Sequence, residues 1–180
     1  GVARAPRAIG TTGVTSPVNL AVESAGQEVG SLAHIYVNGV DVSANQRGYN
    51  VAIIEPGSGR VESVAAFDTH LDETASRALA AFLAEVPDGR IVVVAVADEA
   101  SRLLGPEAVA ALGSIGVGGD LRERFRWGQA AIGVKGAAPG SAIEAMDWLR
   151  PVAVVVGEGI TEPEVGVALG QMTFAVVDGP

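Results

Sequence analysis

The chain has 180 residues with 12 basic and 21 acidic side chains, and its formal net charge is −9. This balance excludes a surface that tracks phosphate groups, so we do not expect a nucleic-acid partner. The sequence has no cysteine, which excludes disulfides, thiol catalysis and thiolate metal sites. No stretch reaches the roughly 20 apolar residues that span a bilayer. Hydrophobic residues make up 48% of the chain, enough for the core of one domain.

Strand patterns dominate the first half of the chain. Residues 1–24 have weak periodicity and predict an N-terminal arm, or an edge strand near 19–24. Alternating and apolar runs then predict four strands, at 31–38, 40–43, 49–54 and 60–67. The Asn38-Gly39 pair and the Pro56–Gly59 turn connect these strands as two hairpins.

The second half mixes helices with strands. Apolar residues at three- and four-residue spacings predict a helix over 69–86, and Pro106 begins a second helix that ends near 112. Ser141 and Glu144 have the spacing of a capping box, which predicts a short helix to 149. Further strands are expected at 91–97, 127–135, 151–157 and 165–177. The order indicates an α+β fold with a largely antiparallel sheet, in one domain over 25–180.

The strand at 91–97 is the stretch around which the other elements are organised. Its seven consecutive apolar residues, rich in valine, are typical of a strand that is covered on both faces. It ends at Asp98-Glu99, so a rigid strand would hold the Asp98 carboxylate at a binding site, with Glu99 pointing away. The alternative is that Asp98 only caps the following helical turn.

A basic cluster follows in the otherwise acidic chain. It consists of Arg122, Arg124, Arg126 and Lys135. Phe125 and Trp127 alternate with these arginines. Arginine donates to hydroxyl or acetamido oxygens, a carboxylate accepts from hydroxyls and an aromatic ring covers the apolar face of a sugar. The composition therefore suits carbohydrate recognition, with one of the two rings stacking on the sugar. The alternative is a solvated turn paired with Asp120 and Glu123.

The other polar residues carry no known catalytic signature. His34 and His70 are the two histidines, a weak basis for zinc in a chain without cysteine. Asp68, His70 and Asp72 could form an acid–base cluster, but a polar helix start explains them as well. A glycosidase needs two opposed carboxylates roughly 5–9.5 Å apart, and Asp68 is the one apparent partner for Asp98. We therefore expect no metal, no cofactor and no enzymatic activity from this segment.

Several strings match, in order, the motifs of a known family. They are AGQEVGSLAHIYVNGVDVS, RGYNVAIIEPGSGRV, FDTH, AFLAEVPDGRIVVVAVADEAS and AAIGVKGAAPGSAIE, between about residues 25 and 144. The chain thus resembles the interleukin-like EMT inducer domain, also called the GG-type lectin domain. The resemblance implies two mostly antiparallel β-sheets packed together and flanked by short helices. The excess of arginine over lysine, together with many alanines, glycines and valines, suggests a bacterial member.

The resemblance also implies a site. The family includes secreted cytokine-like proteins, modules of hyaluronan-processing proteins, and a glycosyltransferase stem domain that resembles a lectin for a GlcNAc-containing glycan. The sugar-contacting positions of that stem domain fall on Arg47, Asp98 and Arg126, to which the residue analysis adds Trp127. We expect a non-catalytic carbohydrate-binding module, extracytoplasmic or secreted, within a longer parent chain. The alternatives are a protein-interaction or assembly module without sugar binding and, third, a glycan-acting hydrolase.

Overall fold

A computed structural model describes residues 6–157 of the chain. The strands within them are β1 (Leu20–Gly26), β2 (Leu32–Val37), β3 (Val40–Asp41), β4 (Gly48–Ile54), β5 (Val61–Phe67), β6 (Ile91–Asp98), β7 (Gly128–Val134), β8 (Ile143–Asp147) and β9 (Val152–Val156). The helices are the 3₁₀ turn η1 (Gln27–Val29), α1 (Ala75–Ala84) and α2 (Pro106–Gly113). The strands expected at 165–177 lie outside the described residues.

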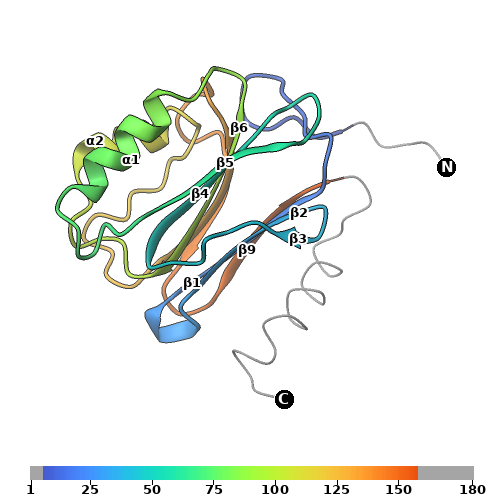
Figure 1. Ribbon diagram of the computed structural model, residues 1–180. Coiled ribbons are helices and arrows are strands. Elements are labelled where there is room, and N and C mark those ends of the chain that lie inside the picture. The colour runs from blue at the N-terminus through green and yellow to red at the C-terminus, as the bar shows by residue number, and fades with distance from the viewer. Residues whose placement is uncertain (1–5, 158–180) are drawn as a thin grey trace, which may run out of the picture.

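The strands form two layers (Figure 1). One layer has the order β8-β7-β6-β4-β5 and the other the order β3-β2-β1-β9, with antiparallel pairing inside each layer. A short parallel pairing of β1 with β6 joins the two layers, at Ala25↔Ala97 and Gly26↔Asp98. The helices α1 and α2 lie side by side on the outer face of the first layer. The predicted α+β fold with two packed, mostly antiparallel sheets is confirmed.

The central strand β6 is buried on both faces because the two layers and the helices enclose it. Ile91, Val93 and Ala95 point into the core between the layers. Val92 and Val94 point to the other side, into a second core against the helices. Burying one valine or leucine side chain is worth about 1.5–3 kcal/mol, so this strand anchors the structure. The prediction of a strand covered on both faces is confirmed.

Two local predictions differ from the structure in part. The strand expected at the edge near 19–24 is β1, which lies inside its layer, between β2 and β9. The helix expected over 69–86 is present but begins later, at Ala75. The Asp68 and Asp72 carboxylates accept hydrogen bonds from the amides of residues 70, 71 and 74, so these residues form turns instead.

The helix predicted from Ser141 to 149 is wrong, because residues 143–147 form the strand β8. The Ser141 hydroxyl donates to the carbonyl of Ala138, and the Glu144 carboxylate accepts from the amides of Gly118 and Gly119. These two side chains therefore do not cap a helix. Pairing with β7 satisfies the backbone of this segment instead, and such tertiary contacts routinely override a weak local preference.

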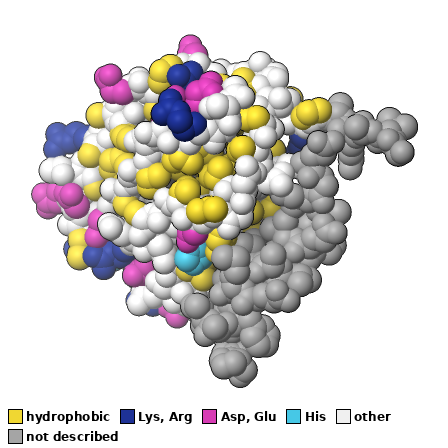
Figure 2. All heavy atoms as spheres, turned by 45° about the vertical axis from the view of Figure 1, so that its right-hand side comes forward, with side chains coloured by type: hydrophobic (Ala, Val, Ile, Leu, Met, Phe, Trp, Pro, Cys, Tyr) yellow, Lys and Arg dark blue, Asp and Glu magenta, His cyan; other side chains and the backbone are white. Residues whose placement is uncertain are grey.

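Two further observations complete the description, one on the surface and one on the helices. On the face that Figure 2 turns forward, hydrophobic side chains gather in the middle and acidic and basic side chains lie side by side around them. No helix within residues 6–157 is long and apolar enough to cross a membrane.

Candidate functional site

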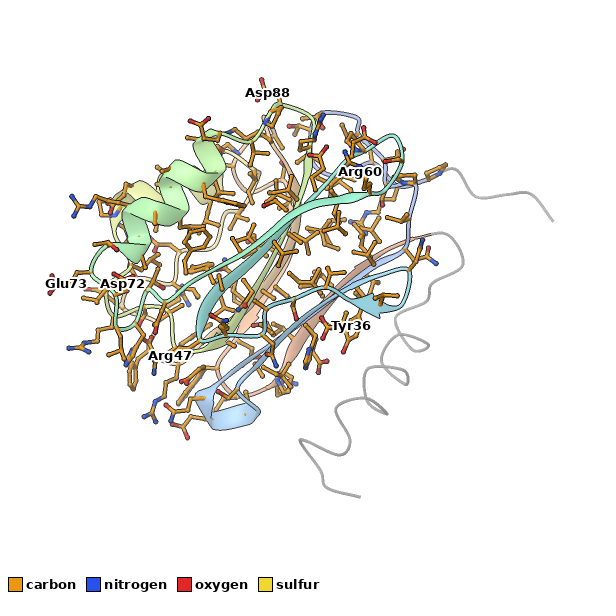
Figure 3. All side chains as sticks on the ribbon, in the orientation of Figure 1. Tyr36, Arg47, Arg60, Asp72, Glu73 and Asp88 are labelled. Atoms are coloured by element: carbon orange, nitrogen blue, oxygen red, sulfur yellow. The ribbon has the colours of Figure 1, made fainter. Side chains whose placement is uncertain are left out.

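Strand register brings Arg47, Asp98 and Arg126 to the same end of the molecule. Gly48 pairs with Ala97, so Arg47 and Asp98 flank adjacent positions of β4 and β6. Asp98 also pairs with Gly26 of β1. The backbone carbonyl of Arg126 lies so close to Gly26 that a Cβ atom there would overlap it. Figure 3 places Arg47 at one end of the molecule and Asp88 at the other.

Asp98 is the most unusual of these residues. It is the last residue of the buried strand β6, and its φ of 64° lies in the left-handed region that favours glycine. Its side chain is half-buried, and within residues 6–157 no side chain or amide donates a hydrogen bond to its carboxylate. A strained backbone that holds an unpaired charge at the end of a rigid strand is typical of a functional position.

Arg47 forms a two-point ion pair with Asp68. The Arg47 Nη2 atom lies 2.7 Å from Asp68 Oδ2, and Nε donates to the same carboxylate at 3.2 Å. This pairing raises the pKa of Arg47 and holds the pKa of Asp68 below its ordinary value. The Asp98 and Glu99 charges also raise the pKa of Arg47, in keeping with their position beside it. Because both partners are about one-third exposed, the pair is worth only about 0–1 kcal/mol.

Arg126 has a similar arrangement on the other side of Asp98. Its guanidinium donates to Glu28 in η1 and lies over the Phe125 ring, 4.7 Å from the ring centroid. The φ of Arg126 is 62°, so this residue is also held in the left-handed region. Phe125 is 55% exposed. Trp127 instead packs against the helix-side core and is covered by Arg124 at 4.6 Å, so Phe125 offers the more accessible ring.

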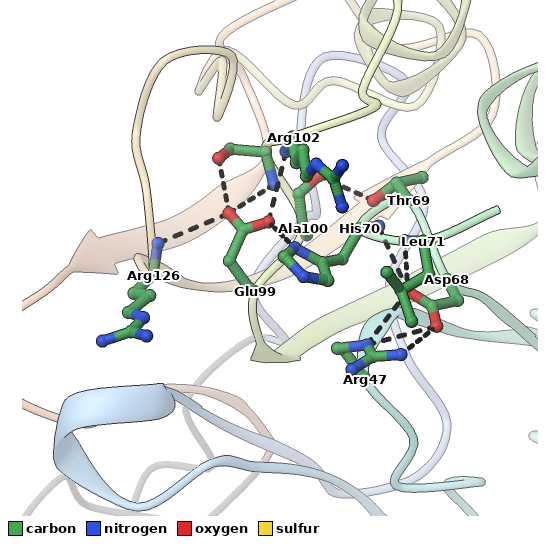
Figure 4. Close-up of polar contacts among 10 residues, drawn as sticks. Arg47, Asp68, Thr69, His70, Leu71, Glu99, Ala100, Arg102 and Arg126 are labelled. Atoms are coloured by element: carbon green, nitrogen blue, oxygen red, sulfur yellow. Dashed lines mark hydrogen bonds and ion pairs between the residues drawn. The ribbon is translucent and has the colours of Figure 1, made fainter. Parts of the chain in front are cut away.

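Glu99 forms the centre of a hydrogen-bond network beneath these residues (Figure 4). Its carboxylate is buried and accepts from the Ser101 amide and hydroxyl, from the Arg102 amide and from the Arg126 amide. It also contacts His70 Nδ1 at 2.6 Å. Burial acts to raise the pKa of Glu99, but the hydrogen bonds from Ser101 and His70 outweigh it, so the pKa lies below its ordinary value. Glu99 is thus an ionised, structural carboxylate.

His70 belongs to this network, although the sequence assigned it to a helix start. The FDTH motif, residues 67–70, precedes the first helix, which begins at Ala75. Two of its polar residues, Asp68 and His70, contact opposite sides of the site. The Asp68 carboxylate holds Arg47, and the His70 ring contacts Glu99. The position of FDTH among the family motifs was a signal that this segment lies near the site.

A shallow hollow of about 570 Å³ lies beside the network, lined by Ser101, Arg102, Leu104, Asp120, Arg122 and Glu123. Arg122 and Asp120 form an ion pair of 2.6 Å at its edge. None of the four residues predicted to contact a sugar lines this hollow. The predicted site is therefore an open surface at the end of the sheet, adjacent to the hollow. Within residues 6–157, no group of three acidic or histidine side chains is arranged to hold a metal ion.

These features define an α+β domain with a polar cluster where its two sheet layers join. A model of the interleukin-like EMT inducer family matches residues 47–137, and the chain belongs to this family. The cell migration-inducing and hyaluronan-binding protein of Homo sapiens is 40% identical over 102 residues, and that of Mus musculus is 39% identical over 102 residues. Each match covers 57% of this chain but 7% of the relative's length.

Proposed function

We propose that this domain is a non-catalytic module that binds carbohydrate, with a GlcNAc-containing glycan as its ligand. The observation that carries the proposal is the strained Asp98, whose carboxylate accepts no hydrogen bond from residues 6–157 and which lies between two arginines. Relatives that carry "hyaluronan-binding" in their name support the same class of ligand. An extracytoplasmic location stays a prediction that accompanies this function.

The three side chains suit the polar groups of a sugar. Asp98 accepts hydrogen bonds from hydroxyls, and both arginines donate to hydroxyl or acetamido oxygens. Arg47 uses Nε and Nη2 for Asp68, so its ion pair leaves Nη1 for the ligand. One of two rings covers the apolar face of the sugar: Phe125 is the more exposed, and Trp127 is the ring predicted from the sequence. Because a small polar ligand buries little apolar area on an open surface, we expect dissociation constants on the order of micromolar to millimolar.

A glycan array tests the proposal, with four variants run beside the parent domain. Asp98→Ala and Arg126→Ala should lose binding, because each removes a direct contact. Asp88→Ala and Arg60→Ala are matched controls, since both residues lie at the opposite end of the molecule (Figure 3). Binding that survives Asp98→Ala would overturn the proposed site. A blank array for the folded parent would overturn carbohydrate binding itself.

A second candidate is a protein-interaction or assembly module that binds no sugar. It is favoured by the two ion pairs, Arg47–Asp68 and Arg126–Glu28, which engage both arginines internally. Phe125, Trp148 and Leu149 are also exposed apolar side chains. Sedimentation of the domain over a range of concentrations, together with a blank array, would separate self-association from carbohydrate binding.

A hydrolytic function has less support from the site. A general acid needs a raised pKa, whereas the Arg47 guanidinium lowers the pKa of Asp68, the carboxylate considered as a partner for Asp98. We propose that the domain itself is not an enzyme. Incubation with a hyaluronan oligosaccharide should therefore release no shorter product.

A further inference from the structure

We propose that His70 is a further ligand-contacting residue, which accepts a hydrogen bond from a sugar hydroxyl through Nε2, and that Glu99 is its positioning residue. This inference rests on the proposed carbohydrate-binding function and assigns a contact to His70, which is not among the four sugar-contacting residues predicted from the sequence. Three observations carry it: the position of His70, the orientation of its ring and the chemistry of its partner. A second histidine in the chain provides a control.

His70 lies between the two arginines in the network of contacts. Its backbone amide donates to Asp68 Oδ1 at 3.1 Å, and the Asp68 carboxylate holds Arg47. Its ring contacts Glu99, and the Glu99 carboxylate accepts from the Arg126 amide at 3.4 Å. Figure 4 shows this sequence of contacts from Arg47 to Arg126, with His70 in the middle. His70 therefore shares a carboxylate partner with each arginine, Asp68 with Arg47 and Glu99 with the Arg126 amide.

The ring orientation leaves one nitrogen for a ligand. Nδ1 is engaged by Glu99 at 2.6 Å. Nε2 has no hydrogen-bond partner within residues 6–157, and it is not among the buried atoms that lack one. Since the His70 side chain is 22% exposed, Nε2 is the ring nitrogen that reaches the surface.

The chemistry of Glu99 determines what Nε2 does. The Glu99 carboxylate is ionised and can only accept hydrogen bonds, so Nδ1 carries the proton. In the neutral ring Nε2 then has a lone pair and accepts from a hydroxyl. The charged groups around the ring are Asp68, Asp98 and Glu99 together with Arg47, Arg102 and Arg126. In its neutral form, the His70 ring thus adds an acceptor beside the arginine donors, and sugar hydroxyls need both.

His34 provides a matched control within the same chain. Its Nδ1 contacts the Asp41 carboxylate at 2.8 Å, and its side chain is 21% exposed. It therefore has the same partner type and nearly the same exposure as His70. It differs in location, because it lies on β2 of the second layer, opposite Glu23. A ligand at the proposed site should contact one histidine and not the other.

The experiment is a titration of ¹⁵N-labelled protein with a hyaluronan tetrasaccharide and with N,N′-diacetylchitobiose, followed through the ring nitrogens. The two histidines give two sets of signals. We expect the Nε2 signal of His70 to shift on binding while His34 stays unchanged. His70→Ala should weaken binding about 5- to 10-fold, the loss of roughly one hydrogen bond, and His34→Ala should leave the affinity within about two-fold.

The outcomes separate this inference from the function on which it rests. Binding that depends on Asp98 but leaves the His70 signal and the His70→Ala affinity unchanged overturns the role of His70 alone. Equal shifts at both histidines indicate a change of the whole fold and also overturn it. If neither sugar binds the parent protein, the carbohydrate-binding function and the inference fail together. Urea unfolding of His70→Ala checks that a loss of affinity is not a loss of fold.

Discussion

Asp98 and Gly26 are the last residues of β6 and β1, and they face each other in the parallel pairing that joins the two sheet layers. Ser24 strengthens this junction, because its hydroxyl donates to the Val96 carbonyl and accepts from the Gln129 amide. Both strands end at this pair, and the chain on either side leads to η1 and to the Glu99 network. The candidate site is therefore built on the junction of the two sheet layers.

The strained backbone of Asp98 predicts opposite effects on stability and binding. Asp98→Gly should relieve the left-handed strain and raise the free energy of unfolding by about 0.5–1 kcal/mol. It should also abolish glycan binding, because the carboxylate is lost. Urea unfolding and the array measure the two effects. Asp98→Ala is the control, since it loses binding without the gain in stability; a Gly variant that is less stable than the Ala variant would contradict the strain.

The contact between Gly26 and the Arg126 carbonyl predicts a steric effect. Gly26→Ala should lower the free energy of unfolding by about 1–3 kcal/mol, because the new methyl group overlaps the carbonyl oxygen. It should also weaken glycan binding by displacing Arg126. Gly113→Ala is the matched control, since its nearest neighbour would be Pro139 at an ordinary 3.7 Å. Calorimetry of both variants checks this, and equal melting temperatures would argue against the close approach.

The burial of Glu23 predicts that the stability of the fold depends on pH, independently of the candidate site. This side chain is 5% exposed, and its Oε2 atom has no hydrogen-bond partner within residues 6–157. Burial raises the pKa of Glu23 to about 7 from an ordinary value of 4.5. Between these two pH values the folded state binds more protons than the unfolded state. Its stability should therefore fall as the pH rises from 4.5 to 7, by on the order of 3 kcal/mol.

The variant Glu23→Gln should remove this dependence. Because glutamine carries no charge, the variant should be more stable than the parent at pH 8 and similar to it near pH 4. Urea unfolding at a series of pH values measures both chains. Glu73→Gln is the control, because Glu73 is an exposed glutamate (Figure 3). If the parent is instead more stable at pH 7 than at pH 4.5, and Glu23→Gln follows the same curve, then Glu23 stays ionised in the folded protein.

Truncation of the two tryptophans should have different effects on stability, because their environments differ. Trp127 packs on the helix-side core, so Trp127→Ala should lower the free energy of unfolding by about 1–3 kcal/mol. Trp148 is 47% exposed, so Trp148→Ala should change it by less than about 0.5 kcal/mol. Chemical denaturation of the two single variants compares them directly. If Phe125 is the ring that meets the sugar, Phe125→Ala should weaken glycan binding several-fold while Trp127→Ala mainly affects stability.

Patterns of short range predicted most elements of the fold. The apolar run of β6 identified a strand buried on both faces because alternate side chains of a strand point to opposite sides. Asn38-Gly39 identified a hairpin because its turn requires residues that tolerate positive φ. In contrast, the Ser141–Glu144 pattern indicated a helix. The open edge of β7 supplied backbone hydrogen bonds that this local pattern could not register.

The sequence by itself determined the α+β class, the central strand, and the residue types that suit a polar ligand. The tertiary structure decided which of those residues meet. Arg47, Asp98 and Arg126 lie on separate elements, and strand register with the β1–β6 junction brings them together. It also decided that Glu99 is buried and that His70 contacts it. The reason is physical: backbone pairing and burial act between segments far apart in the chain, whereas periodicity and turn chemistry report on neighbours alone.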